Sequence, residues 1–274
     1  MATRNLVLLH GLLSRFLAEE WEPKAGRQDS TYAISLTSWS KRLNDLQLTL
    51  VTLINQEVRP AAIYVWLTED DLNLIPRVSR RLFEAQGVQF ETCVDYRSHK
   101  KWLPLILSGH HKPFVVCDDD IFYPREWFGR LVAEDRMDAY VGCKCHRMSA
   151  GESGLPGSYS DWEKLIYHQE VPSEALFATG CGGVIIHPKR LSERALDWTA
   201  IQEYALFSDD AWLKAAHLAS GIPVFKTRYC FPCLELPGTD ESGLLANHNT
   251  DGNDEQIEAV WAYFGLEDTI GGSS

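Results

Sequence analysis

The sequence has no long hydrophobic run. None of its apolar stretches reaches the roughly 18 residues that a membrane-spanning helix needs. The apolar stretch Leu6–Leu13 has no small-residue cleavage site after it and leads into Arg15 and several acidic residues, which is not typical of a secretion signal. We therefore interpret residues 1–30 as an amphipathic helical segment and expect a cytoplasmic protein. The helix is expected to pack against the rest of the chain, and peripheral attachment to the inner face of a membrane is the alternative.

Basic residues are scarce relative to acidic ones. The chain has 26 Lys and Arg against 38 Asp and Glu, which gives a formal net charge of −12. Proteins that bind nucleic acid usually carry a basic patch, so this balance argues against a nucleic-acid partner. A nucleotide ligand is still compatible with the composition, because it needs only a local positive group.

Cysteine is present in an odd number, seven, in a chain too large to depend on disulfides. We expect reduced thiols. Two pairs have the spacing of metal ligands, Cys143 with Cys145 and Cys230 with Cys233, and suggest a zinc site. The alternative is that Cys143 and Cys145 are small core residues on one face of a strand at 139–145.

Internal repeats and linkers are also absent, so nothing divides the chain into independent domains. Hydrophobic residues make up 45% of the chain and charged residues 23%, as in an ordinary globular protein with enough apolar material for a core. The last residues, 267–274, end in two glycines and two serines and are expected to be disordered.

Strand and helix patterns alternate in the first half of the chain. Short runs rich in β-branched and aromatic residues predict strands, and apolar residues at helical spacing predict helices. The predicted strands are 32–36, 62–67, 88–94 and 113–117, and the predicted helices are 42–56, 70–86 and 100–107. Ser40 is a candidate N-cap for the first helix, and Pro76 is expected to divide the second. Repeated strand–helix–strand units predict an α/β fold with a mostly parallel sheet and helices on both faces.

The pattern is less regular after residue 120. Predicted strands lie at 139–145, 184–187 and 224–227, and predicted helices at 125–134, 191–199, 209–220 and 255–264. The segment 149–160 is rich in glycine, proline and serine and is predicted to be a loop, and the polar segment 235–254 is predicted to be irregular.

Three consecutive carboxylates, Asp118-Asp119-Asp120, follow the buried strand at 113–117. The carboxyl ends of strands are where open α/β sheets bind ligands. Like charges this close repel, so either some are protonated or a cation lies among them, and a hard divalent ion such as Mg²⁺ or Mn²⁺ is the natural partner. The alternative is an acidic turn that caps the next helix, although a cap needs only one Asp.

These patterns together resemble those of a known family. The order of motifs is similar to that of GT-A glycosyltransferases, and more narrowly to the bacterial family-2-like enzymes that act on surface polysaccharide. The similarity covers roughly Tyr32 to Gly221, with a weaker echo at 249–257. The residues that carry it are Ser35–Ser38, Asn55-Gln56, Ile63–Thr68, Asp95–Ser98 and Val115–Asp120.

The resemblance implies a Rossmann-like GT-A fold and a metal-dependent transfer of a sugar from a nucleotide-sugar donor, expected to be a UDP-sugar, to a glycan or lipid-linked glycan acceptor. Residues 31–146 would form the half that binds the donor, and residues 147–266 the acceptor-binding and catalytic half of the same domain. In the Asp-x-Asp pattern Asp118 would face the sugar or ribose, Asp120 would hold Mn²⁺ or Mg²⁺, and Asp119 would assist either. The implied metal ligands are Asp120, Asp118 and, from the late polar stretch, His248.

Several residues near the ends of the first three strands are expected to contact the donor. The hydroxyls of Thr37 and Ser38 suit the base or ribose, and Glu69 and Asp95 end the second and third strands. The basic cluster Arg97, Lys100 and Lys101 would bind the diphosphate. The alternatives are a strand-end turn for Thr37 and solvated charges for Arg97 and Lys100, but cations are disfavoured at the start of a helix unless an anion is near.

A second acidic site is Asp209-Asp210, at the start of the helix predicted at 209–220. An inverting transfer needs a base for the proton of the acceptor hydroxyl, and the resemblance implies that Asp210 or Asp209 is that base. Trp212 would pack near the sugars. The alternative is a helix cap formed by Ser208 and Asp209, and one Asp can cap while the other points into the cleft.

The glycine-rich segment Gly180-Cys181-Gly182-Gly183 lets the backbone come close to a ligand, and the resemblance implies that it lines the sugar and acceptor pocket. A plain turn is the alternative. Trp39, Trp66 and Trp162 are candidates for stacking on a sugar.

Two functions of other classes stay open at this stage. One is a metal-dependent phosphohydrolase acting on nucleotide sugars, which also clusters aspartates at strand ends. The other is a non-catalytic module that binds a nucleotide or glycan, because fold alone does not determine function.

Overall fold

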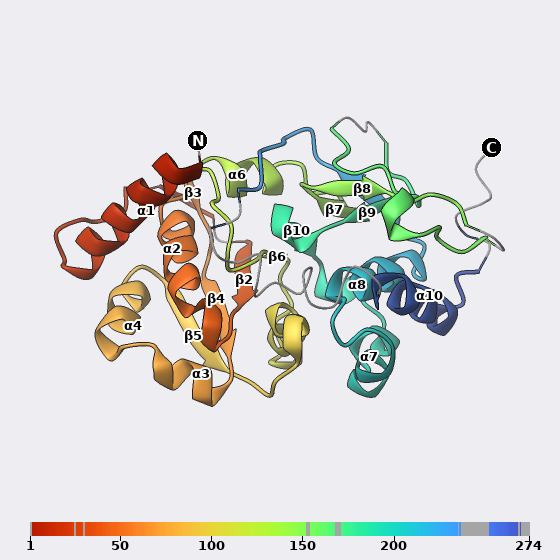
Figure 1. The fold of residues 1–274 in the computed structure, drawn as a ribbon, viewed down its shortest axis with the longest axis horizontal. Coiled ribbons are helices and arrows are strands. Elements are labelled where there is room, and N and C mark those ends of the chain that lie inside the picture. Colours follow the sequence, from red (N-terminus) through yellow and green to blue (C-terminus); the bar gives the residue numbers. More distant parts are fainter. Residues whose placement is uncertain are drawn as a thin grey trace.

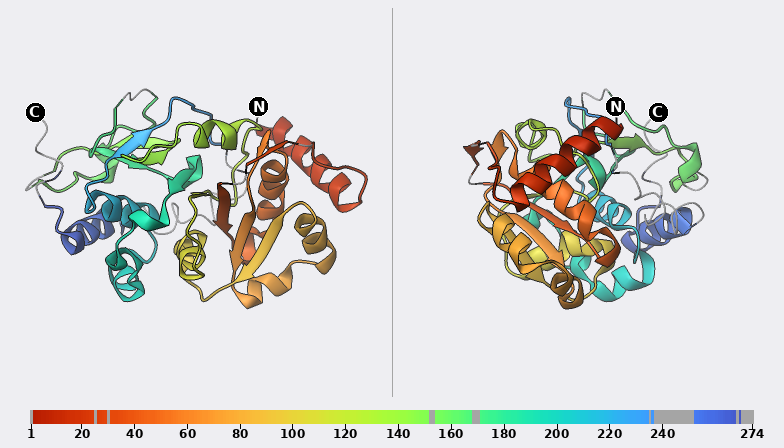
Figure 2. Two further views of the ribbon diagram at one scale, coloured as in Figure 1. Left: turned by 180° about the vertical axis from the view of Figure 1, so that it is seen from behind. Right: turned by 60° about the vertical axis from the view of Figure 1, so that its left-hand side comes forward.

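A seven-stranded sheet runs through the middle of the molecule (Figure 1). The computed structural model describes residues 2–24, 26–29, 31–151, 154–167, 171–234, 236, 252–267 and 269. In spatial order the strands are β11 (Val224–Lys226), β7 (Tyr140–Gly142), β10 (Val184–Ile186), β6 (Phe114–Val116), β2 (Ala33–Thr37), β4 (Ile63–Leu67) and β5 (Val88–Thr92). β2, β4 and β5 lie on one side of β6, and β10, β7 and β11 lie on the other (Figures 1 and 2).

Most strands of this sheet run in the same direction. β2, β4, β5 and β6 form parallel pairs, and β11 pairs parallel with β7. β10 is antiparallel to both of its neighbours, β6 and β7. The predicted α/β fold with a mostly parallel sheet is therefore confirmed, with one reversed strand that the strand–helix alternation does not predict.

Helices cover both faces of the sheet, as predicted. Alternate residues of β6 point to opposite faces, so Phe114 and Val116 belong to one hydrophobic cluster and Val115 to the other. One face carries α2 (Leu43–Ile54), α4 (Arg77–Glu84) and α6 (Trp127–Val132), and the other carries α5 (Leu103–Leu107), α7 (Trp198–Tyr204), α8 (Asp209–Leu218) and α10 (Gly252–Phe264).

The first helix, α1 (Ala2–Leu17), packs over α2 and α4. Leu9 and Phe16 are its buried residues among those whose side chains are described, and the Phe16 ring lies 4.9 Å from that of Phe83. In the part of the chain that the structure describes, no helix combines the length and the hydropathy needed to cross a bilayer.

The remaining elements are short. They are α3 (Glu69–Leu74), the parallel pair β1 (Arg27–Gln28) and β3 (Val58–Arg59), the antiparallel pair β8 (Cys145–Arg147) and β9 (Leu176–Ala178), and the 3₁₀ helices η1 (Ser40–Arg42), η2 (Arg97–Lys101), η4 (Tyr159–Asp161), η5 (Gly180–Gly182), η6 (Pro188–Arg190) and η7 (Glu193–Leu196).

Several predicted boundaries need correction. Pro76 does divide the region 70–86, into α3 and α4. Ser40 is not a cap, because η1 precedes α2 and the N-cap of α2 is Arg42, which makes no side-chain capping bond. The helix predicted at 191–199 is η7 followed by α7, whose true cap is Asp197, an acceptor for the backbone N–H groups of two following residues.

The strand predicted at 139–145 is also two strands, β7 and β8. Cys143 lies between them in one hydrophobic cluster, and Cys145 begins β8 in the other, so the two cysteines are buried but do not share a face. The polar segment 235–254 and the tail 267–274 lie largely outside the described residues, and α10 begins at Gly252, ahead of the predicted start at 255.

Candidate active site

The acidic triplet lies where the connections of the sheet change sides. From β2 the chain goes first to β4 and β5 on one side and returns later to β6 on the other. Such a switch point leaves a crevice at the carboxyl ends of the two strands, and ligands of open α/β sheets bind there. Thr37 ends β2 and Asp118 to Asp120 follow β6, so these predicted site residues lie at the switch point.

A buried lysine joins the two acidic sites. The ammonium of Lys101, at the end of η2, lies 2.8 Å from Asp118 Oδ1 and 2.9 Å from Asp209 Oδ2. The side chains of Lys101 and Asp209 are each 7% exposed, and that of Asp118 is 29% exposed. The carboxyl end of β6 and the start of α8, which are 91 residues apart in the chain (209 − 118), therefore meet at one cation.

A second cation, Arg42, pairs with the other two carboxylates of the triplet. Its Nη1 lies 3.1 Å from Asp119 Oδ1 and 3.0 Å from Asp120 Oδ2. Thr49, two helical turns further along in α2, donates its hydroxyl proton to the backbone carbonyl of Asp119 at 2.8 Å. The start of α2 thus holds both the side chains and the backbone of the triplet.

Asp209 and Asp210 point to different partners, as neighbouring helical residues must. Asp209 faces Lys101, whereas Asp210 accepts the backbone N–H of Gly180 at 3.0 Å through Oδ1. The N-cap of α8 is Ser208, and it makes no side-chain capping bond, so the capping alternative is not what holds this turn. Asp210 is half-buried, and Asp209 is buried.

The electrostatics of the cluster show an excess of negative charge. Five carboxylates (Asp118, Asp119, Asp120, Asp209 and Asp210) face the two cations Arg42 and Lys101. Burial, and then the neighbouring Asp209, raises the pKa of Asp210 well above the ordinary value, and burial also raises the pKa of Asp119. Burial alone would lower the pKa of Lys101, but its acidic neighbours outweigh burial and raise it.

This cluster fits a hard divalent cation in donor type and in charge. Its side chains offer carboxylate oxygens, which Mg²⁺ and Mn²⁺ prefer, and two protein cations leave part of the negative charge unmatched. In the described part of the chain no three His, Cys, Asp or Glu side chains are already arranged around one metal position. His248, the predicted third ligand, lies outside the described residues.

The glycine-rich segment packs against the cluster. A Cβ on Gly180 would stand 2.9 Å from Lys101 Nζ and 3.4 Å from Asp118 Oδ1, and Gly183 has a φ of +94° with Trp127 2.6 Å from where a Cβ would be. The sequence predicts close approach of a ligand here. The structure adds that these glycines are needed for close approach of the protein's own charged and aromatic groups.

Several side chains that are predicted to contact the donor are paired with other groups of the protein. Asp95 is 40% exposed and pairs with Arg97 at 2.9 Å and with Lys100 at 3.5 Å. The anion beside these two cations is therefore a carboxylate of the protein itself. Thr37 donates to the carbonyl of Trp66 at 2.8 Å, and the buried Ser38 accepts Lys100 Nζ through its carbonyl at 3.3 Å. Glu69 is exposed in the first turn of α3, which Thr68 caps.

The predicted aromatic contacts need correction. Trp212 does not line the site, because its side chain is fully buried among Tyr263 and Phe264, and its Nε1 donates to Ala195 O at 2.8 Å. Trp66 and Trp162 are also core residues. Trp39, which is 36% exposed and follows Ser38, is the remaining candidate for stacking on a ligand.

Two residues of the site, Arg42 and Tyr123, are missing from the predictions made from sequence. Arg42 stands at the start of a helix, where a cation is disfavoured without an anion nearby, and this signal would have identified it. The hydroxyl of the buried Tyr123 accepts the backbone N–H of Asp118 at 3.0 Å and donates to the Cys181 carbonyl at 3.1 Å. Tyr123 thereby fixes the triplet to the glycine-rich segment, and no local pattern indicates that role.

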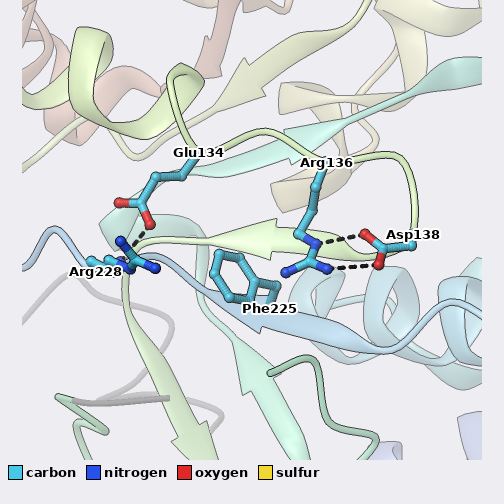
Figure 3. A pocket seen from close by; sticks show the side chains of 5 residues that line it. All are labelled: Glu134, Arg136, Asp138, Phe225 and Arg228. Carbon is cyan, nitrogen blue, oxygen red and sulfur yellow. Dashed lines mark hydrogen bonds and ion pairs between the residues drawn. The ribbon is translucent and has the colours of Figure 1, made fainter. Parts of the chain in front are cut away.

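A separate surface hollow of about 390 Å³ lies beside β11 (Figure 3). The guanidinium of Arg136 pairs with Asp138 at 2.5 Å and lies 4.7 Å from the Phe225 ring centre, while Glu134 accepts the backbone N–H of Arg228 at 2.8 Å. Its charged groups already satisfy one another, and no predicted site residue lines it. We therefore assign the candidate active site to the acidic cluster.

The helix that carries Asp210 also contains a fully buried lysine, Lys214, one turn further on. Its ammonium donates to the carbonyl of Glu174 at 2.7 Å, and burial lowers its pKa from 10.5 to about 7. Because the unfolded chain binds this proton up to pH 10.5 and the folded chain only up to about 7, the stability of the protein should rise with pH between these values.

Replacing this lysine by an apolar residue of similar length should stabilise the protein at low pH. The penalty for charging Lys214 inside the fold is roughly 5 kcal/mol, and roughly 1–3 kcal/mol of this gain is offset because the Glu174 carbonyl is left unpaired. Lys214→Met should therefore raise the melting temperature by a few degrees at pH 6, and the gain should shrink by pH 9. A gain of the same size at both pH values would mean that packing, and not charge, is responsible.

Comparisons with known proteins give no family assignment. No family model matches the chain, and no curated protein matches it. Among solved structures it is similar to a mannosyltransferase from Pyrobaculum calidifontis in complex with GDP-Man and Mn²⁺, with 13% identity, 96% of this chain and 78% of that chain covered and a TM-score of 0.45. It is also similar to the inositol-1-phosphate CTP transferase of T. maritima, with 11% identity, 88% and 98% covered and a TM-score of 0.42. Likenesses this weak carry no argument about the chemistry of the chain.

Proposed function

We propose that the protein is a glycosyltransferase that moves a sugar from a nucleotide-sugar donor to a saccharide or lipid-linked saccharide acceptor. The observation that supports this best is the Lys101 bridge, which brings Asp118, at the switch point of the sheet, to Asp209 at the start of α8. A ligand at the carboxyl ends of β2 and β6 would therefore lie beside the half-buried carboxylate of Asp210. Residues 31–146 would bind the donor and residues 147–266 the acceptor.

Asp210 is the proposed base. Its Oδ1 is oriented by the Gly180 N–H, and its raised pKa makes it a stronger proton acceptor than an ordinary aspartate. It takes the proton of an acceptor hydroxyl while that oxygen bonds to the anomeric carbon, and the sugar–phosphate bond breaks to release a nucleoside diphosphate. Attack from the face opposite the leaving group inverts the anomeric configuration. Asp209 is less suited to this task, because it is buried and paired with Lys101.

The negative charge of the donor's diphosphate would be neutralised by a metal ion at the switch point of the sheet. Asp118 and Asp120 would hold Mn²⁺ or Mg²⁺, and such an ion, when bound, neutralises the departing diphosphate. Arg42 and Lys101 reduce the repulsion among the carboxylates of the cluster, and they pair with the same carboxylates, Asp120 and Asp118, that the ion would use. UDP is the nucleoside diphosphate we expect, and Trp39 offers an exposed ring beside Ser38 for the base or sugar.

A ligand that binds only the folded protein raises its melting temperature, and this tests the donor class. UDP with Mn²⁺ at about 100 times its dissociation constant should contribute roughly 3 kcal/mol, or several degrees, and GDP, CDP and ADP should give less. Asp120→Asn should remove the manganese-dependent part of the shift. The control Asp138→Asn, an exposed carboxylate paired with Arg136, should keep it. If no nucleoside diphosphate shifts the curve at millimolar concentration, the donor assignment is wrong.

The released nucleotide separates the proposed reaction from its alternatives. Sugar transfer breaks the bond between the sugar and phosphate and releases a nucleoside diphosphate, only when an acceptor is present. A phosphohydrolase breaks the diphosphate itself and releases a nucleoside monophosphate without any acceptor. A non-catalytic binding module releases neither and would bind the nucleotide equally well after Asp210→Asn.

A further inference from the structure

Two cysteines that are far apart in sequence meet beside the candidate active site. Cys181 lies in the glycine-rich segment, and Cys233 lies in the stretch 227–234 that follows β11. The thiol of Cys233 donates to the Cys181 carbonyl oxygen at 3.8 Å, and the two thiols are near enough for each to shift the pKa of the other. Both side chains are partly exposed and both are reduced.

The stretch 227–234 is held firmly against the site. The carbonyl of Leu234 accepts the backbone N–H of Phe122, two residues after the acidic triplet, at 3.1 Å. The carbonyl of Tyr229 accepts Cys143 Sγ at 3.4 Å, and the ring of Phe231 lies 6.0 Å from that of Tyr123. These contacts, made on both sides of Cys233, keep its thiol next to Cys181.

Cys181 has the character of a reactive thiol. The hydrogen bond from Cys233 stabilises its thiolate against the effect of burial, and Lys144 adds a positive charge, which lowers the pKa of Cys181 to about 6. Its Sγ also lies 3.4 Å from the hydroxyl of Thr179. Burial raises the pKa of Cys93 and of Cys143 to about 11, so these thiols are far less reactive at neutral pH.

We propose that Cys181 and Cys233 form a reversible disulfide when the protein meets a small-molecule disulfide such as oxidised glutathione. The Cys181 thiolate attacks one sulfur of oxidised glutathione, which forms a mixed disulfide and releases one glutathione thiolate. The Cys233 thiol gives its proton to the released glutathione thiolate and attacks the Cys181 sulfur, which releases the second glutathione as a thiolate. Two protein thiols are oxidised and one glutathione disulfide is reduced to two thiols.

The crosslink would act on the site through the glycine-rich segment. Gly180, next to Cys181, orients Asp210 through its N–H, and the Cys181 carbonyl accepts the Tyr123 hydroxyl that holds Asp118. A bond between the sulfurs pulls Cys181 toward Cys233 and disturbs both contacts. The consequence for activity rests on the proposed function, but formation of the bond does not.

Thiol mapping tests the bond without any assay of activity. The protein is equilibrated with mixtures of reduced and oxidised glutathione at pH 7.5, trapped by alkylation and digested, and the disulfide-linked peptides are identified by mass spectrometry. We expect a linked pair that contains Cys181 and Cys233, absent from Cys233→Ser and kept in Cys230→Ser, which removes the exposed cysteine three residues away. Pairing of Cys230 with Cys233 or Cys143, or glutathionylation of Cys230 with Cys181 and Cys233 still reduced, would overturn the proposal.

A second readout connects the bond to the site. Oxidation should lower the rate of nucleoside diphosphate release at least tenfold, dithiothreitol should restore it, and Cys233→Ser should keep the basal rate but resist oxidation. If the mapped disulfide forms and the rate is unchanged, its proposed effect on Asp210 is wrong although the bond is real. If neither form releases a nucleoside diphosphate, the proposed function fails and the thiol mapping stands by itself.

Discussion

Asp210→Asn is expected to lower the turnover of sugar transfer by about a hundredfold to ten-thousandfold, which is the contribution of a well-placed general base. The amide oxygen of Asn can still accept the Gly180 N–H, so the turn should keep its geometry. The melting temperature should change little or rise, because the substitution removes one of five neighbouring negative charges. The measurement is a steady-state rate of nucleoside diphosphate release together with a melting curve for the same preparation.

Asp209→Asn is the matched control at the adjacent position. It weakens the bond to Lys101 at a buried carboxylate, so its main effect should be a loss of stability. The two variants therefore separate chemistry from folding. Asp210→Asn should lose mainly turnover and keep its stability, whereas Asp209→Asn should lose mainly stability and keep more of its turnover. The assignment of the base is wrong if Asp209→Asn loses turnover at full stability while Asp210→Asn stays within tenfold of the wild type.

The pH profile supplies an independent check on Asp210. Transfer requires the carboxylate form, so the rate should fall as the pH is lowered through the pKa of Asp210. Burial and the neighbouring Asp209 raise that pKa, so the acid limb should lie well above the range of an ordinary aspartate. The residual activity of Asp210→Asn should lack this limb, whereas a limb that persists unchanged in the variant would belong to another group.

Much of the first half of the fold follows from local patterns. The strands β2, β4, β5 and β6 and the position of the acidic triplet are close to what the apolar runs and the turn residues predict. In these segments the period of the side chains, the length of each run and the connecting helices all favour the same parallel arrangement. The triplet at the end of β6 is then placed by the sheet itself.

The later half depends on contacts that no local pattern shows. β10 runs antiparallel to β6 although its sequence, Val184–Ile186, is as apolar as that of a parallel strand. Cys143 and Cys145 have strand-like spacing, yet the chain turns between them and sends them to different clusters. In both cases the tertiary environment overrides the preference of the short segment.

The candidate site was predictable in kind but not in its pairings. The sequence places Lys101 in a basic cluster that is predicted to bind the diphosphate. Its actual partners, Asp118 and Asp209, lie at sequence separations that no spacing rule links, and the pairing exists only because α8 begins beside β6. Trp212 is predicted to pack near the sugars, but it is fully buried against Tyr263 and Phe264, which are also distant in sequence.

Lys101→Met is expected to be the most destabilising single change in the site. It leaves Asp118 and the buried Asp209 without their common cation, and removal of one partner from a buried ion pair costs about 3–5 kcal/mol. For a chain of this size the melting temperature should fall by roughly 10 °C. Lys100→Met is the control one residue earlier. Lys100 pairs with one carboxylate, Asp95, which is 40% exposed at 3.5 Å, and it also donates to the Ser38 carbonyl at 3.3 Å, so the loss there should be smaller, about 1–2 kcal/mol.

A second substitution tests whether charge is the cause. In Lys101→Met the cost comes from two carboxylates that face each other without a cation, so adding Asp118→Asn should recover part of the lost stability even though it removes another polar contact. If the two residues act independently, Asp118→Asn should destabilise the Lys101→Met protein by as much as it destabilises the wild type. That result would contradict the proposed coupling between Lys101 and Asp118. Equal losses in Lys101→Met and Lys100→Met would likewise contradict a bridging role, because of these two lysines Lys101 is the one that pairs with carboxylates of both halves of the proposed site.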